Sequence, residues 1–173
     1  MATKKSIWLL FGVLLISVWV LGSLIEAGAE TINYKFYVWM NKREAVSVDD
    51  VEGHIVTLAQ RGGFYVLQGG EIATMKRVSL NDLIQGTGSA VAYETITFAD
   101  GSTIVLKRQT AMRGTGGIVA SGESTSEILK GTGRFQGIKG TQTDKTKFLP
   151  PEPSEVGSKQ YGEGTITYTL PTK

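Results

Sequence analysis

The sequence predicts an all-β domain, an antiparallel barrel or sandwich, that follows an apolar N-terminal segment. Two observations favour this fold class. Apolar and polar residues alternate at both ends of the domain, and glycine-rich turns separate seven or eight strand-like runs. In addition, the chain shows neither a long amphipathic helix nor the spacing typical of βαβ units.

The first 29 residues have the layout of an export or anchoring segment. Lys4 and Lys5 precede Ser6–Ile25, a run of 20 uncharged residues, and Ala27-Gly28-Ala29 places small residues at a cleavage site. This order is typical of a secretory signal peptide that is cleaved after Ala29, although a run of this length can also remain in a bilayer as an apolar helix. We therefore expect a single domain at residues 30–173 that is secreted or periplasmic, or alternatively anchored to the membrane by that helix.

Composition excludes several classes of function. The 173 residues include 18 basic and 16 acidic side chains, so the charge is nearly balanced and nothing indicates a nucleic-acid partner. There is no cysteine, which excludes disulfides, thiol catalysis and cysteine-ligated metal centres. The single histidine, His54, excludes zinc motifs built on pairs of histidines. We expect neither a metal nor a cofactor.

The domain begins and ends with strands that have two distinct faces. Ile32, Tyr34, Phe36, Val38 and Met40 are apolar at every second position. Residues 165–170 repeat this alternation with threonine, isoleucine, tyrosine and leucine, which suit a pleated surface. We expect the apolar face of each strand to lie on the core.

The clearest hairpin signal is Asp100-Gly101, which separates two strand-like runs. A two-residue turn there pairs Tyr93 with Arg108 and Glu94 with Lys107. Tyr93 and Arg108 would then line the interior and suit an anionic or carbonyl ligand, because a tyrosine–arginine pair can stack in a partly dry cavity. The alternative is an arginine in solvent on the outside of the barrel.

Three further segments carry local signals. Gly62-Gly63 and Gly69-Gly70 indicate turns or bulges, and residues 78–84 suggest a short helical turn with Ser79 as its N-cap. Pro150, Pro151 and Pro153 indicate a loop before the last strand. His54 opens the next apolar run; a histidine can act as a general base, but at the start of a strand a structural role is the simpler interpretation.

The stretch from Gly131 to Gly140 has the pattern Gly-Thr-Gly-x-Phe-x-Gly-x-x-Gly and resembles the allene oxide cyclase barrel-like and dirigent families. Further matching pieces lie at residues 53–56, 61–64, 70–74 and 97–103, so the resemblance covers residues 53–140, about half of the chain. It implies an eight-stranded antiparallel closed β-barrel with a central cavity, often assembled as a trimer, and it extends to exported bacterial proteins.

The resemblance also bears on activity. In plant allene oxide cyclases the cavity steers the cyclisation of an unsaturated fatty-acid epoxide, and the first strand carries a Glu two residues before an Asn near the substrate. Asn41 matches that Asn, whereas Trp39 stands at the position of the Glu, and the catalytic Cys of the family has no counterpart. The resemblance therefore implies Asn41 as a site candidate and leaves enzymatic activity open.

Three functions remain open at this stage. The leading one is the binding of a small, largely apolar or amphipathic ligand in the barrel, with Tyr93, Arg108, Asn41 and His54 as candidate ligand-binding residues. The second is a cyclase or isomerase that orients a flexible substrate by shape. The third is a structural or interaction protein whose barrel is filled by side chains. A homo-oligomer, a trimer by resemblance, is compatible with each of them.

Overall fold

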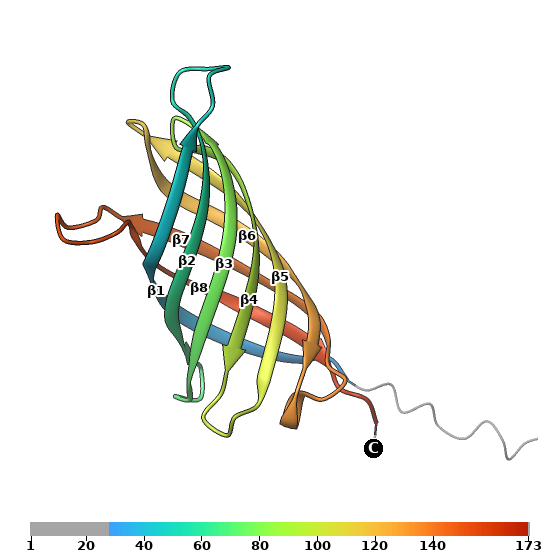
Figure 1. Cartoon of the computed structure of the whole chain (residues 1–173). Helices are drawn as coiled ribbons and strands as arrows, with labels where there is room; N and C mark the ends of the chain where they lie inside the picture. Colours follow the sequence, from blue (N-terminus) through green and yellow to red (C-terminus); the bar gives the residue numbers. More distant parts are fainter. Residues whose placement is uncertain (1–27, 173) are drawn as a thin grey trace, which may run out of the picture.

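Eight strands form one closed antiparallel barrel in chain order, as the resemblance implied (Figure 1). The computed structural model describes residues 28–172, so the expected apolar helix at Ser6–Ile25 lies outside the described residues. Each strand pairs with the next, and β8 closes the barrel on β1. The elements are β1 (Glu30–Ser47), β2 (His54–Leu67), β3 (Ile72–Ile84), β4 (Thr87–Thr97), β5 (Thr103–Thr115), β6 (Ile118–Gly131), η1 (Gly133–Phe135), β7 (Lys139–Leu149) and β8 (Lys159–Thr169).

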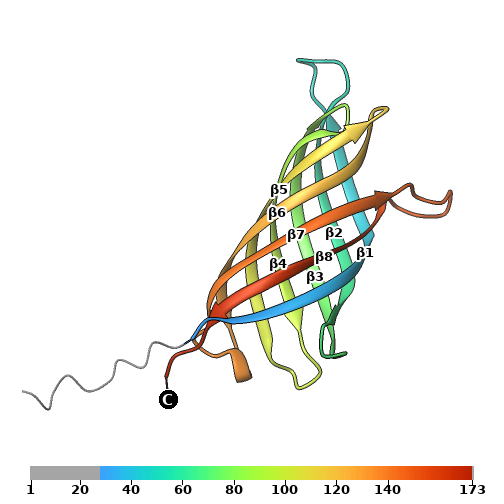
Figure 2. The same ribbon diagram turned by 180° about the vertical axis from the view of Figure 1, so that it is seen from behind.

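The barrel has two different ends. The β1–β2, β3–β4 and β5–β6 connections lie at the upper end in Figure 1. The β4–β5 hairpin, η1 and the C-terminus lie at the lower end, as the view from behind also shows (Figure 2). The loop with Pro150, Pro151 and Pro153 connects β7 to β8 as predicted, and it projects away from the side of the barrel. Within residues 28–172 no helix has the length and hydropathy needed to cross a membrane.

The lower half of the barrel holds the hydrophobic core. The alternation predicted for the first and last strands is confirmed, because Tyr34, Phe36 and Val38 of β1 and Ile166 and Tyr168 of β8 are all buried. Burial of apolar surface of this kind is the main stabilising contribution to folding. Phe135 of η1 and Ile138 after it close the core from below. The other strands contribute Tyr65, Ala73, Met75, Ile96, Phe98, Ile104, Leu106 and Ile128.

Two local predictions are wrong and one is confirmed. Gly69-Gly70 forms the β2–β3 turn, whereas Gly62-Gly63 lies within β2, opposite Trp39 and Val38 of β1. Residues 78–84 are not helical but form the second half of β3. The helical prediction failed because Val78 and Leu80 point outward while Ser79 and Asn81 are buried, an inverted pattern that does not look like a core strand.

Candidate functional site

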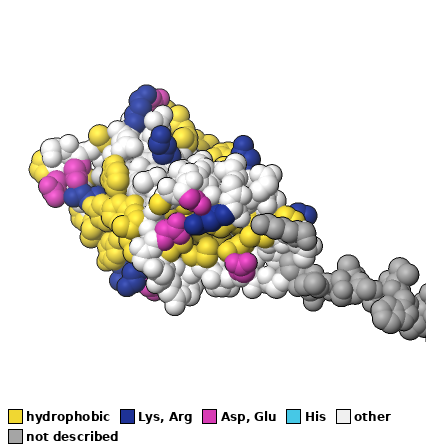
Figure 3. Space-filling model, turned by 90° about the horizontal axis from the view of Figure 1, so that it is seen from below, with side chains coloured by type: hydrophobic (Ala, Val, Ile, Leu, Met, Phe, Trp, Pro, Cys, Tyr) yellow, Lys and Arg dark blue, Asp and Glu magenta, His cyan; other side chains and the backbone are white. Residues whose placement is uncertain are grey.

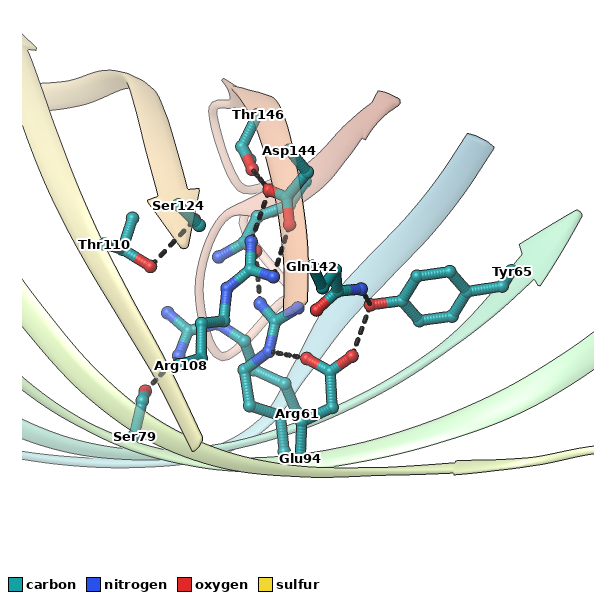
Figure 4. A network of polar contacts seen from close by, with 12 residues as sticks. Arg61, Tyr65, Ser79, Glu94, Arg108, Thr110, Ser124, Gln142, Asp144 and Thr146 are labelled. Atoms are coloured by element: carbon teal, nitrogen blue, oxygen red, sulfur yellow. Dashed lines mark hydrogen bonds and ion pairs between the residues drawn. The ribbon is translucent and has the colours of Figure 1, made fainter. Parts of the chain in front are cut away.

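The upper half of the barrel interior is polar and carries five buried charged residues. Strand alternation turns their side chains inward, where water cannot solvate them, so each needs a partner inside the protein. Three of the five are arginines and two are carboxylates. The buried polar set is Thr57, Arg61, Arg77, Ser79, Asn81, Glu94, Arg108, Thr110, Ser124, Ser126, Gln142, Asp144, Thr146 and Gln160, and Figure 4 shows most of it.

Arg108 of β5 and Asp144 of β7 form a two-pronged ion pair across the barrel. Thr146 and Tyr34 donate further hydrogen bonds to the Asp144 carboxylate, at 3.2 and 3.3 Å. Burial alone lowers the pKa of Arg108, but the charges of Asp144 and Glu94 outweigh burial and raise that pKa above its ordinary range. Arg108 therefore stays charged beside Asp144.

A second pair joins Arg77 of β3 to Glu94 of β4, with 2.6 Å between Nε and Oε2. The Tyr65 hydroxyl donates to the same carboxylate, and the Arg77 Nη1 donates to Gln160 at 3.1 Å. Burial raises the pKa of Glu94, but the Arg77 and Arg108 guanidiniums outweigh burial and lower it below its ordinary value. Burial and the Glu94 charge raise the pKa of Tyr65. Neither group is suited to proton transfer near neutral pH.

Arg61 is the third buried arginine, and it forms no ion pair with any of the described residues. Arg61 is 6% exposed; its Nη1 donates to the Ser79 hydroxyl at 2.8 Å, and its Nε has no hydrogen-bond partner in the described part of the chain. Burial, with the positive charges of Arg77 and Arg43, lowers the pKa of Arg61 to about 9. The interior thus carries one guanidinium more than its carboxylates can neutralise.

This excess charge faces a small chamber. The space holds about 10 Å³, close to what one water-sized atom occupies. Two further buried atoms in its wall, Nη2 of Arg77 and Oδ1 of Asn81, lack hydrogen-bond partners. Among residues 28–172 no carboxylate lines the chamber. Its lining is Arg61, Arg77, Ser79, Asn81, Ala90, Ala92, Arg108, Thr110, Met112, Thr146, Phe148 and Gln160.

A much larger hollow of 1350 Å³ lies on the outer surface and runs from β4 across β5–β8 and β1 to β2. Its lining combines exposed polar residues, such as Thr125, Thr143 and Lys145, with buried ones, among them Asp144. Polar groups exposed in this way are already solvated and gain little from a ligand. The internal chamber, where a buried charge lacks a partner, is therefore the better candidate site despite its size.

Arg108 lies inside the barrel as predicted, but the pairing predicted for it is wrong. The β4–β5 connection is one residue longer than a two-residue turn: Thr97 pairs with Thr103, and Gly101 takes a φ of 80°. This matches a three-residue loop with a glycine in the left-handed region. The longer loop shifts the register by one residue, so Arg108 faces Ala92, and Tyr93 faces Lys107 on the outer surface with 56% of its area exposed. Tyr93 does not line the interior.

Asn41 and His54 both lie away from the chamber. A β-bulge between Met40 and Lys42 takes Asn41 out of the β1–β2 pairing, and its exposed side chain lies beside Gly62 on the outer surface. Trp39 also points outward, so the two positions that the resemblance placed near a substrate do not face the interior. His54 begins β2 at the upper end, where its imidazole bridges Asp50 and Asp82 at 2.6 and 2.8 Å.

His54 should make stability depend on pH. Hydrogen bonds to Asp50 first, and to Asp82, raise its pKa above 6.5. A raised folded-state pKa means that this stabilisation is complete below the unfolded pKa of about 6.5 and is lost as pH rises through the folded value. We expect the melting temperature of the wild type to fall more between about pH 6 and pH 8 than that of His54→Gln. Parallel profiles in differential scanning calorimetry would contradict this role.

Sequence reasoning missed Arg61, Arg77, Glu94 and Asp144. It placed Glu94 opposite Lys107 in solvent, whereas Glu94 is 1% exposed. The available signal was the alternation of polar Arg77, Ser79 and Asn81 with outward apolar residues in β3. Among residues 28–172, no group of three or more His, Asp or Glu side chains is placed to hold a metal ion.

Comparison with known proteins finds no matching family model and no matching curated protein. Two solved structures of pterocarpan synthase dirigent proteins are similar in part. One is 13% identical, with 84% of this chain and 87% of that chain covered at a TM-score of 0.49. The other is 14% identical, with 84% and 97% covered at a TM-score of 0.47. The closed eight-stranded barrel rests on the strand pairing of this chain itself.

Proposed function

We propose that the domain is an extracytoplasmic binding protein for a small amphipathic ligand whose anionic head, a carboxylate, enters the polar half of the barrel. The observation that carries this proposal is Arg61, a buried guanidinium without a carboxylate partner beside a chamber lined by two other arginines. An unpaired charge in such surroundings is costly, and an anion that pairs with it recovers that cost. The expected export signal at residues 1–29 supports the location.

The size and lining of the chamber set the ligand class. About 10 Å³ accepts one oxygen of a carboxylate rather than a bulky headgroup. Ala90, Ala92, Met112 and Phe148 add apolar surface to the same lining, and because the chamber takes only one atom, the hydrocarbon part of the ligand extends beyond it. This ligand retains the amphipathic character expected from the sequence but replaces Tyr93 with Arg61 as the group that orients it.

A binding role agrees better with the interior than the cyclase or isomerase alternative. Both interior carboxylates are held by arginines, and the buried tyrosine hydroxyl of Tyr65 is a poor acid. No described group at the chamber is therefore free to take or give a proton near neutral pH. A barrel filled by side chains would bind no ligand, so a binding experiment separates this alternative from the proposed binding role.

Isothermal titration calorimetry with octanoate and octanol tests the proposal. We expect the wild type to bind octanoate at least about tenfold more tightly than octanol, a difference of about 1.4 kcal/mol. Arg61→Met should remove this preference, and Arg113→Met, at an exposed arginine of β5, should keep it. Equal binding of both probes, or no binding of either, would favour the filled barrel.

Arg61→Met should also change stability in the absence of ligand. Removing an uncompensated buried charge while keeping side-chain volume should raise the free energy of unfolding by about 1–4 kcal/mol, because apolar replacements of buried charges are often stabilising. Urea unfolding of both proteins in a buffer free of carboxylates measures this. A loss of stability would show that Arg61 is already compensated in the native state.

A further inference from the structure

A cluster of three aromatic side chains stands on the outer surface of β1 and β2. Tyr37, Trp39 and Phe64 contact one another, with ring centroids 5.9 to 6.4 Å apart. Trp39 lies over Gly62, where a Cβ would come within 3.4 Å of the indole. Trp39 and Phe64 are nevertheless 39% and 36% exposed, so the cluster is held in place yet remains open to solvent.

The strand register extends this cluster into a wider apolar area. Tyr161 of β8 pairs with Tyr37 on one side, and Val66 pairs with Ile72 of β3 on the other. All three of these added side chains are at least 39% exposed. We call Tyr37, Trp39, Phe64, Val66, Ile72 and Tyr161 the aromatic face. Figure 3 shows hydrophobic side chains gathered on part of the surface, with both basic and acidic side chains beside them.

The rim of the aromatic face carries three lysines and one carboxylate, Glu163, which pairs with Lys35 in the strand register. Lys35 pairs with Val66, Lys76 with Gly62 and Lys147 with Tyr161, so each lysine adjoins the face in the strand register. All three are exposed, and none forms an ion pair with another described residue. Apolar patches with a polar rim mark interaction surfaces.

We infer that the aromatic face docks on the surface of an anionic lipid bilayer. Tyrosine and tryptophan favour the boundary between hydrocarbon and water, because each combines an apolar ring with a polar group. The three lysines complement anionic headgroups, which attract nearby basic residues. A second copy fits less well, because a twofold interface places the same patch on both partners and brings the lysines of one near those of the other.

Photocrosslinking with a diazirine-bearing lipid tests this on the full chain. In vesicles of phosphatidylcholine with phosphatidylserine, peptide mapping should find labels on Tyr37, Trp39 or Phe64. In pure phosphatidylcholine these labels should drop about fivefold for each lysine that no longer finds an anionic partner. Labels within residues 1–29 report the N-terminal segment and serve as the internal reference, so the experiment does not depend on ligand binding in the barrel.

Variants complete the test. Trp39→Ser with Phe64→Ser, and separately Lys76→Glu, should reduce labelling of the face relative to residues 1–29. Tyr93→Ser, at an exposed aromatic of β4 outside the face, should leave it unchanged. Lys76→Glu changes charge without removing apolar surface. It therefore still tests the inference if the double serine variant fails to fold. Labels confined to residues 1–29, or crosslinks between copies through the face, would overturn the inference.

Discussion

Asp144→Asn should lower the free energy of unfolding by about 3–5 kcal/mol, because it leaves the Arg108 guanidinium buried without a counter-charge. Arg108 is 2% exposed and would then share the interior with Arg61 and Arg77 opposite a single carboxylate, Glu94. The change also weakens the hydrogen bonds that Tyr34 and Thr146 donate to Asp144. Such a loss is a large part of the stability of a typical domain, about 5–15 kcal/mol. Equilibrium unfolding in urea measures it.

Two controls separate charge from packing in this prediction. Replacing both partners, Arg108→Met with Asp144→Leu, should restore most of the lost stability, since buried ion pairs are often replaceable by apolar residues of similar volume. Glu127→Gln changes an exposed carboxylate of β6 and should have almost no effect. If Asp144→Asn were as stable as the wild type, the ion pair would not be a structural element of the barrel.

Gly162→Ala is expected to have the second large effect, a loss of about 3 kcal/mol and of roughly 10 °C in melting temperature. Gly162 lies in β8 between Phe36 of β1 and Thr146 of β7. A Cβ there would lie 2.7 Å from the Phe36 ring and would also collide with the Lys145 carbonyl oxygen. Because a carbonyl in a strand ladder cannot move freely, the barrel wall itself must shift.

Gly69→Ala is the matched control for this steric effect. Gly69 lies in the β2–β3 turn, and a Cβ at that position would meet no atom within 4 Å. Its stability should equal or slightly exceed that of the wild type, because alanine has fewer conformations in the unfolded chain. Thermal unfolding followed by circular dichroism compares the two variants. Equal melting temperatures would show that β8 can accommodate a side chain at Gly162.

The hydrophobic core in the lower half of the barrel could be predicted from the alternation of apolar and polar residues. Tyr34, Phe36 and Val38 alternate with polar residues and turn inward, and Ile166 and Tyr168 do the same in β8. The position of the β4–β5 hairpin was likewise predictable from Asp100-Gly101. Its length was not, because a two-residue turn and a three-residue loop share this dipeptide. One extra residue was enough to move Tyr93 from the expected interior to the surface.

In the upper half, polar residues point inward and apolar residues point outward, so the candidate site could not be predicted from the sequence. In β3, Arg77, Ser79 and Asn81 point inward while Val78 and Leu80 point outward. Sequence-based prediction places charged residues in solvent, because charged side chains are seldom buried unless they are paired. Only the closed barrel brings Arg108 of β5 to Asp144 of β7, 36 residues away, and shows that Arg61 is left over. Long-range charge pairing of this kind is not encoded in local periodicity.

The central claim is that the polar half of the barrel takes an anion at Arg61. The most direct measurement is anomalous diffraction from crystals of the protein grown in sodium bromide. The excess interior charge predicts a bromide peak inside the barrel, within contact of the Arg61 guanidinium and the Ser79 hydroxyl, which is absent from crystals of Arg61→Met. Bromide peaks confined to the outer surface of the wild type, with water or nothing beside Arg61, would contradict the claim.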